Sequence, residues 1–192
     1  KFVPIKTPIA QKSLFDMGRI DPEKMYSNIQ KWDWRNINDG KIYLDEQTKR
    51  NSISMRNSLF RLSDAFAQKG DTIKAIEVLN LSLEKMPIKD FSHYTLSTGY
   101  PEAYYKLGNQ EKARETAETL LKVYREKATW LSTFDIDDLP LIEDELQTAF
   151  YIFDTIVRNI ELYDNDKDYL QQKKQSVNEI FRLFSHLMPD EE

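Results

Sequence analysis

The fold is decided by the stretch LFRLSDAFAQKGDTIKAIEVL, residues 59–79. Its apolar residues recur at steps of three and four, which is the spacing of one face of an α-helix. Gly70 interrupts this pattern and suits a tight turn between two helices. Pro87, further along, cannot continue a helix and is expected to end the second one. The stretch therefore predicts two helices joined by a turn at Gly70.

A second stretch, YYKLGNQEKA at residues 104–113, repeats this spacing 38 residues later. Together the two copies fit the signature of the tetratricopeptide repeat, whose period is about 34 residues. The matching positions are Leu59, Leu62, Phe66, Gly70, Ala75 and Pro87 in the first copy and Tyr104, Gly108 and Ala113 in the second. Small Ala75 and Ala113 would let two helices approach closely. Pro101 indicates that the first helix of the second copy starts late or is kinked.

The rest of the chain is expected to be helical as well. Residues 141–188 have the length and periodicity of a third, degenerate helix pair, without its small-residue signature. An acidic loop is expected over residues 132–145. We predict an all-α fold of tetratricopeptide-like helical hairpin repeats, an α–α superhelix, with an irregular N-terminal segment. An ordinary helical bundle with two accidental matches is the alternative.

The N-terminal part is expected to differ from the rest. Residues 1–45 are interpreted as an extended segment with one short helix, which starts at Asp21 and Pro22. Residues 46–192 form the helical domain, and both parts belong to one compact unit. The sequence starts with Lys1 rather than Met, so we expect a piece of a longer protein.

Composition limits the possible functions. The chain has 192 residues, 40% hydrophobic and 31% charged, which is a globular balance. Its net charge of −5 opposes general nucleic-acid binding. It has no cysteine, and its two histidines, His93 and His186, are far apart, so no metal site is expected. No apolar run approaches the roughly 18 residues of a membrane span, so this chain is not expected to insert into a membrane.

Two acidic motifs have residue types found in calcium-binding loops or in pairs of catalytic carboxylates. Asp164, Asp166 and Asp168 resemble the start of a calcium-binding loop, but Tyr169 and Gln175 stand where glycine and glutamate are needed. A solvated turn with a helix cap is the favoured interpretation. The acids from Asp135 to Glu145 are interpreted as a solvated face rather than a catalytic pair. With no phosphate-binding loop and no serine elbow, we expect no catalytic residue and no cofactor.

Trp32 and Trp34 lie two residues apart in an irregular stretch beside Arg35. Aromatic rings on loops serve sugar or partner recognition, and they also anchor loops onto helical cores. The anchoring role is the favoured one.

Several segments of residues 1–130 resemble a known family. They are VPI at 3–5, DPEKMY at 21–26, KWDWRNIND at 31–39, IYLDE at 42–46, Arg56-Asn57, Ala75-Ile76 with Leu79, EAYYK at 102–106 and Gly108. They look like the C-terminal region of bacterial multi-pass membrane proteins catalogued as domain-of-unknown-function family 2723, which is similar to protein O-mannosyltransferases of the GT-C type. The resemblance implies a tetratricopeptide-like domain after a membrane-embedded glycosyltransferase-like unit, on the periplasmic face of the inner membrane. The family's catalytic acids would lie in that unit, so none is assigned to this chain.

The binding face is predicted from the repeat register. Stacked helix pairs line a concave surface with the first helix of each pair, which suits a peptide or an extended partner. The outward positions there are Asn57, Phe60, Arg61 and Asp64 in the first copy and Glu102, Tyr105 and Lys106 in the second. The alternative for Phe60 is that the N-terminal segment covers it with Phe2, Val3 and Ile5. The expected partner is a protein or peptide, including the membrane unit of the parent protein. An acceptor-positioning role for a protein O-glycosyltransferase and a purely structural cap are the alternatives.

Overall fold

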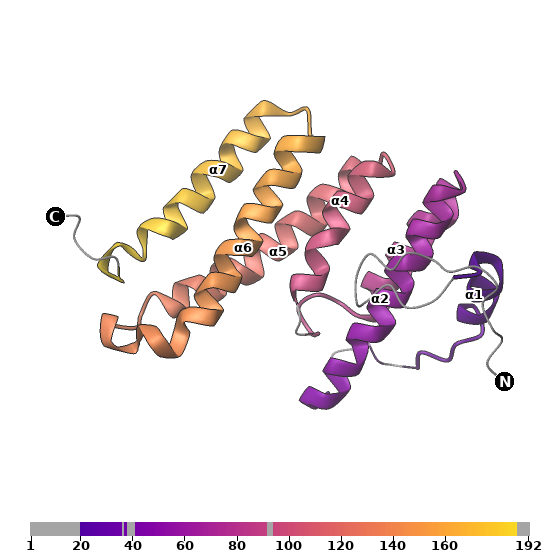
Figure 1. Cartoon of the computed structure of the whole chain (residues 1–192), viewed down its shortest axis with the longest axis horizontal. Helices are drawn as coiled ribbons and strands as arrows, with labels where there is room; N and C mark the ends of the chain where they lie inside the picture. Colours follow the sequence, from indigo (N-terminus) through magenta and orange to yellow (C-terminus); the bar gives the residue numbers. More distant parts are fainter. Residues whose placement is uncertain (1–19, 36, 38–40, 92–93, 188–192) are drawn as a thin grey trace, which may run out of the picture.

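The computed structural model describes residues 20–35, 37, 41–91 and 94–187. This part of the chain contains helices and no strand, so the predicted all-α class is confirmed. Figure 1 shows the helices side by side along the longest axis, from α1 at one end to α7 at the other. Residues 1–19 of the predicted N-terminal segment lie outside the described residues, and so does His93.

Seven α-helices and three short 3₁₀ turns make up the described part. The α-helices are α1 (Pro22–Ile29), α2 (Glu46–Gln68), α3 (Thr72–Lys85), α4 (Gly99–Lys106), α5 (Gln110–Leu131), α6 (Leu139–Tyr163) and α7 (Lys167–Arg182). The 3₁₀ turns are η1 (Tyr94–Thr98), η2 (Ile136–Asp138) and η3 (Ser185–Leu187).

Local sequence signals set most of these boundaries. The carboxylates of Asp21 and Asp45 accept hydrogen bonds from backbone N–H groups in the first turns of α1 and α2. Pro101 is the third residue of α4, a helix of only 8 residues that follows η1. The predicted late start at Pro101 therefore corresponds to a shortened helix.

Two boundaries differ from the predictions. The helix expected from Leu141 begins at Leu139, because Pro140 stands in its first turn, where a missing N–H costs nothing. The last acidic residues of the expected loop, Glu143, Asp144 and Glu145, are consequently in α6. The helix pair expected over residues 141–188 has its last α-helix end at Arg182, and η3 follows.

The turns after Phe66 and after Tyr104 have the same geometry. Gly70 has φ of +79° and Gly108 has φ of +75°, a backbone region that residues with a Cβ rarely adopt. The N–H of Asp71 donates to the carbonyl of Phe66 at 3.0 Å, and the N–H of Asn109 donates to the carbonyl of Tyr104 at 2.9 Å.

The capping bonds on the far side of these two turns also match. The side chains of Asp71 and Asn109 accept from the N–H groups of Lys74 and Lys112, each at 3.1 Å. The two segments that align without a gap in the sequence thus make the same two-helix connection.

The third connection, between α6 and α7, is built differently. Asp164, Asn165 and Asp166 form it without a glycine, and the N–H of Asp166 donates to the carboxylate of Asp164 at 3.0 Å. Asp166 caps α7 by accepting from the N–H of Tyr169 at 3.0 Å. A side-chain oxygen of Asp164 therefore stabilises this turn, whereas the first two turns use a glycine in the left-handed region.

The core runs through the stack as three contiguous apolar clusters. One joins α1, α2 and α3, and another joins α5, α6 and α7. Leu79, Tyr100, Tyr104 and Ala113 form the cluster that links the first helix pair to the second. The repeat positions buried with no exposed area are Leu59, Leu62, Phe66, Ala75, Tyr104 and Ala113. Pro87 stands two residues after the end of α3.

Candidate interaction site

A groove of about 290 Å³ lies between α2 and α4. We call it the α2–α4 groove. Its α2 wall is made by Phe60, Ser63, Asp64 and Ala67, with Thr72 at the start of α3. Its α4 wall is made by Gly99, Glu102, Ala103, Lys106 and Leu107. Most of these side chains are small, which keeps the groove open between helices of the two pairs.

Phe60 forms the floor of the groove. A Cβ at Gly99 would lie 3.2 Å from Cζ of Phe60, which is tighter than most Cβ contacts, so glycine lets the ring lie close to the backbone of α4. The ring also meets Tyr100 edge to face, with 5.5 Å between the ring centres. Phe60 is half-buried by these contacts and turns its remaining surface to the groove.

Four of the seven predicted binding residues meet in this groove: Phe60, Asp64, Glu102 and Lys106. Asn57 and Arg61 are half-buried on α2, have interactions of their own and do not line the groove.

Tyr105, the remaining predicted residue, points elsewhere. Its hydroxyl donates to Oδ2 of Asp164 at 2.7 Å, and its ring stacks on Tyr163. Tyr105 does not line the α2–α4 groove, because its hydroxyl bonds a carboxylate 59 residues further along the chain.

The surroundings of Asp164 form a second polar site, which we call the Asp164 junction. The Asp164 side chain has no exposed area. It receives two hydrogen bonds from the Arg114 guanidinium, both at 2.7 Å, and one from Gln110 at 2.8 Å, in addition to that from Tyr105. α4, α5 and the α6–α7 turn are therefore joined through one carboxylate.

These contacts change the acid–base properties of the junction. The hydrogen bonds from the Arg114 guanidinium hold the pKa of Asp164 well below its usual range. Burial, followed by the bond to Asp164, raises the pKa of Tyr105. Arg114 also lies over the ring of Tyr169, 4.4 Å from the ring centre. The junction is thus a saturated ionic contact that holds the helices together.

The interpretation of Asp164 as part of a solvated turn was wrong, although the helix cap at Asp166 is present. Nothing local in the sequence reveals the difference, since Arg114 is 50 residues away.

Arg56 was likewise not predicted to be a buried residue. It is 4% exposed, donates to the carbonyl of Met86 at 2.6 Å and lies 5.6 Å from the ring centre of Tyr100. Its spacing of three from Leu59, on the core stripe, is the signal that could have found it.

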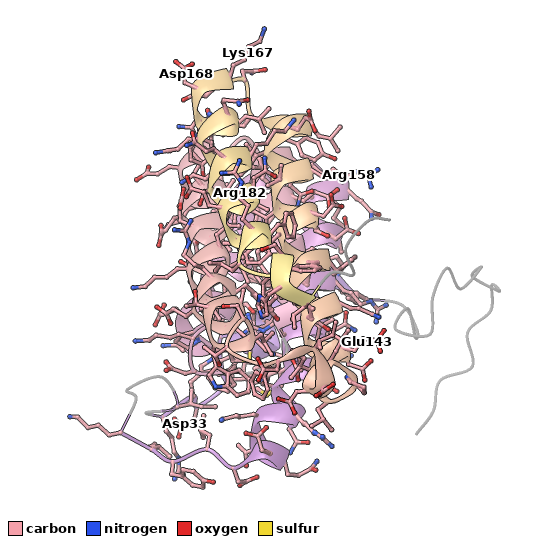
Figure 2. All side chains as sticks on the ribbon, turned by 90° about the vertical axis from the view of Figure 1, so that its left-hand side faces the viewer. Asp33, Glu143, Arg158, Lys167, Asp168 and Arg182 are labelled. Carbon is pink, nitrogen blue, oxygen red and sulfur yellow. The ribbon has the colours of Figure 1, made fainter. Side chains whose placement is uncertain are left out.

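The acidic residues near the α5–α6 connection lie away from the junction. Asp135, Asp137, Glu143, Asp144 and Glu145 are exposed, as expected for a solvated face. Figure 2, seen from the α7 end, shows Glu143 towards one end of the helices and Lys167 and Asp168 at the other. The acidic face and the Asp164 junction are therefore at opposite ends of the α6–α7 pair.

The two tryptophans of the irregular stretch differ in their surroundings. Trp34 packs against the apolar cluster of α1, α2 and α3. Trp32 remains 39% exposed and touches Trp34, with 5.3 Å between the ring centres. The favoured anchoring role thus describes Trp34 better than Trp32.

Near the other end of the chain, Nε2 of His186 lies 3.1 Å from the carbonyl oxygen of Phe134.

Comparison of the chain with protein-family models, with curated proteins and with solved structures finds no match. In residues 20–35, 37, 41–91 and 94–187, no three histidine, aspartate or glutamate side chains gather where they could hold a metal ion. Over the same residues no helix has both the length and the apolar character needed to span a membrane. The described part of the chain is all-helical, with consecutive helices packed side by side (Figure 1).

Proposed function

We propose that this chain is a non-catalytic protein-interaction module that binds a protein or peptide in the α2–α4 groove. The observation that carries the proposal is the meeting of Phe60, Asp64, Glu102 and Lys106 in one groove between two helix pairs. An aromatic floor with charged groups at its rim is the composition of many binding hot spots. A groove between paired helices is also where peptides bind to helical repeat proteins.

We further propose that the helix pairs are tetratricopeptide-like. The matching left-handed glycines at Gly70 and Gly108 support this proposal, as do the matching caps at Asp71 and Asn109. The glycine-free turn at Asp164 fits a third, degenerate pair at the end of a stack.

The resemblance of residues 1–130 to the C-terminal region of membrane glycosyltransferase-like proteins supports a setting for the module. We propose that it is a periplasmic part of such a protein, where it binds an acceptor protein or the parent's membrane unit. Catalysis would then belong to the membrane unit.

A structural cap on another domain is the second candidate, and one observation favours it. Large apolar side chains are exposed near the α5–α6 connection, with Trp130 at 58%, Ile136 at 52% and Leu141 at 79%. A contiguous exposed apolar patch is typical of a surface that another protein covers, and these three side chains flank one helix connection. This region differs from the α2–α4 groove, so variants can separate the two functions.

The experiment is a quantitative pull-down from the native envelope fraction with three matched variants. Ala103→Phe fills the groove, Asp64→Lys reverses a charge on its rim, and Leu141→Ser changes the exposed apolar region. We expect the two groove variants to lose the main partners and Leu141→Ser to keep them. Circular dichroism would establish that all three variants fold.

Loss of partners in Leu141→Ser alone would contradict the binding role of the groove and favour the cap. Retention of all partners by Ala103→Phe would also contradict it, because the inserted ring would occupy the space that a ligand needs.

A further inference from the structure

The charges around the α2–α4 groove are unequal on its two walls. On the α2 wall, Oδ2 of Asp64 accepts from Nε2 of Gln68 at 2.6 Å, and Asp64 is exposed. Among the residues that the structure describes, no cationic side chain forms an ion pair with Asp64. Among the described side chains, none donates a hydrogen bond to its Oδ1.

On the α4 wall the charges compensate one another. Nζ of Lys106 lies 2.5 Å from Oε1 of Glu102, and the hydroxyl of Tyr163 donates to the same oxygen at 3.3 Å. The Lys106 ammonium also lies over the Tyr163 ring, 5.7 Å from its centre. Lys106 is thus engaged by its own chain, whereas Asp64 has no cationic partner among the residues that the structure describes. A ligand that supplies a cation would complement it.

The apolar part of the groove limits the size of what can enter. Phe60, Ala67, Ala103 and Leu107 surround a space of about 290 Å³. This volume is at the lower end of ligand pockets, which run from about 300 to 1,000 Å³. It accommodates one or two side chains of a segment that lies across the opening.

The walls also decide how such a segment is recognised. Both are α-helices, whose backbone N–H and C=O groups bond within the helix, so a ligand cannot add to them as a β-strand does to a sheet edge. Recognition must come from side chains, namely the aromatic floor and the Asp64 carboxylate.

Building on the proposed function, we propose that the α2–α4 groove binds an extended peptide segment in which an apolar side chain stands next to a lysine or arginine. The apolar side chain enters against Phe60, Ala103 and Leu107. The cation meets Oδ1 of Asp64 at the rim. The Asp64 carboxylate can accept hydrogen bonds from lysine and arginine alike.

The test titrates the full chain with three octapeptide pools, followed by amide chemical shifts in NMR spectra. Each pool has random glycine, serine and alanine flanks around a fixed central pair, which is Leu-Arg, Leu-Glu or Gly-Arg. We expect the Leu-Arg pool to shift the amides of the groove residues and to bind about tenfold more tightly than the Leu-Glu pool. The Gly-Arg pool should bind more weakly than Leu-Arg because it lacks the apolar anchor.

Two variants make the comparison specific. Asp64→Lys should reverse the preference between Leu-Arg and Leu-Glu. Asp154→Lys carries the same charge change on an exposed position of α6, outside the groove lining, and should leave both affinities unchanged. Asp64 is exposed, so its replacement should not prevent folding.

The outcomes separate this inference from the proposed function. Groove shifts of equal size with Leu-Arg and Leu-Glu, unaffected by Asp64→Lys, would overturn the requirement for a cation and leave the binding face intact. No groove shift with any pool would overturn both. Groove amides that shift in the peptide-free chain on dilution, or in Lys6→Glu, would assign the groove to a second copy or to the chain's own N-terminal segment and overturn the proposal.

Discussion

The α2–α4 groove and the Asp164 junction share α4, yet their charged groups have opposite surroundings. In the junction, the Asp164 carboxylate is buried and receives hydrogen bonds from three side chains. In the groove, the Asp64 carboxylate is exposed and bonds only Gln68 among the described side chains. A carboxylate saturated by side chains of its own chain stabilises the fold, whereas an exposed carboxylate can take a ligand.

The consecutive residues Tyr105 and Lys106 belong to different regions, the first to the Asp164 junction and the second to the α2–α4 groove. Tyr105 donates to Asp164, and the next residue lines the groove. Neighbouring positions on a helix point about 100° apart, so one turn of α4 serves both regions. Changes in the junction should therefore act on stability, and changes in the groove should act on binding.

The largest effect is expected from Asp164→Ala. It removes the buried acceptor of Tyr105 and Gln110 and leaves Arg114 with Asp166 as its acceptor. We expect a loss of about 3 kcal/mol in the free energy of unfolding, measured by urea denaturation. Asp154→Ala, at an exposed position of α6, is the matched control and should change it by less than about 0.5 kcal/mol. Equal midpoints for the two variants would mean that the junction does not stabilise the fold.

Overpacking between paired helices is expected to come next. Ala75→Leu and Ala113→Leu place extra methyl groups at positions with no exposed area. Each should cost about 1–3 kcal/mol of unfolding free energy. Circular dichroism and urea midpoints are the measurements. Midpoints like that of the parent would contradict close helix contact at these positions.

The sequence predicts the helix pairs well because their determinants are local. Apolar spacing, capping side chains and the two glycines each act within a few residues, so the pattern specifies where α2, α3 and α5 begin and end. The Asp164 junction depends on residues 50 or more positions apart, and no periodicity encodes that distance. For the same reason the pattern identified four groove residues from the helix face but placed Tyr105 with them.

A smaller effect is expected at the two matching turns. Gly70→Ala and Gly108→Ala each force a Cβ into the left-handed region, with no neighbouring atom within 4 Å to clash. The cost is therefore conformational, about 1 kcal/mol, and should be equal in the two variants. Asn165→Ala in the third turn should cost less, because no positive φ is required there. The measurements are thermal and urea unfolding of all three variants. Unequal losses of stability for Gly70→Ala and Gly108→Ala would contradict the equivalence of the two turns.

Acid should weaken the junction selectively. Because the pKa of Asp164 is depressed in the folded chain, its ionised form stabilises the fold above the unfolded value of about 3.9. That contribution should be lost as the pH falls below about 4 towards the folded pKa. Urea midpoints at pH 7, 5, 3 and 2 should fall more steeply for the parent than for Asp164→Asn. Parallel curves would show that Asp164 is not linked to acid unfolding.

The smallest effect on stability is expected in the groove. Asp64→Lys changes an exposed side chain and should alter the free energy of unfolding by less than about 0.5 kcal/mol. A larger loss of stability, measured by the same urea titration, would mean that Asp64 belongs to the structural network rather than to a binding site.

The most direct test of the interaction role is to locate a ligand on the chain. A peptide selected by display against the full chain would be titrated into it, and the amide shifts would be mapped. We predict the largest shifts within residues 60–67 and 99–107, where the α2–α4 groove lies. Shifts concentrated in residues 132–145, or shifts spread without preference over all helices, would contradict binding through the groove.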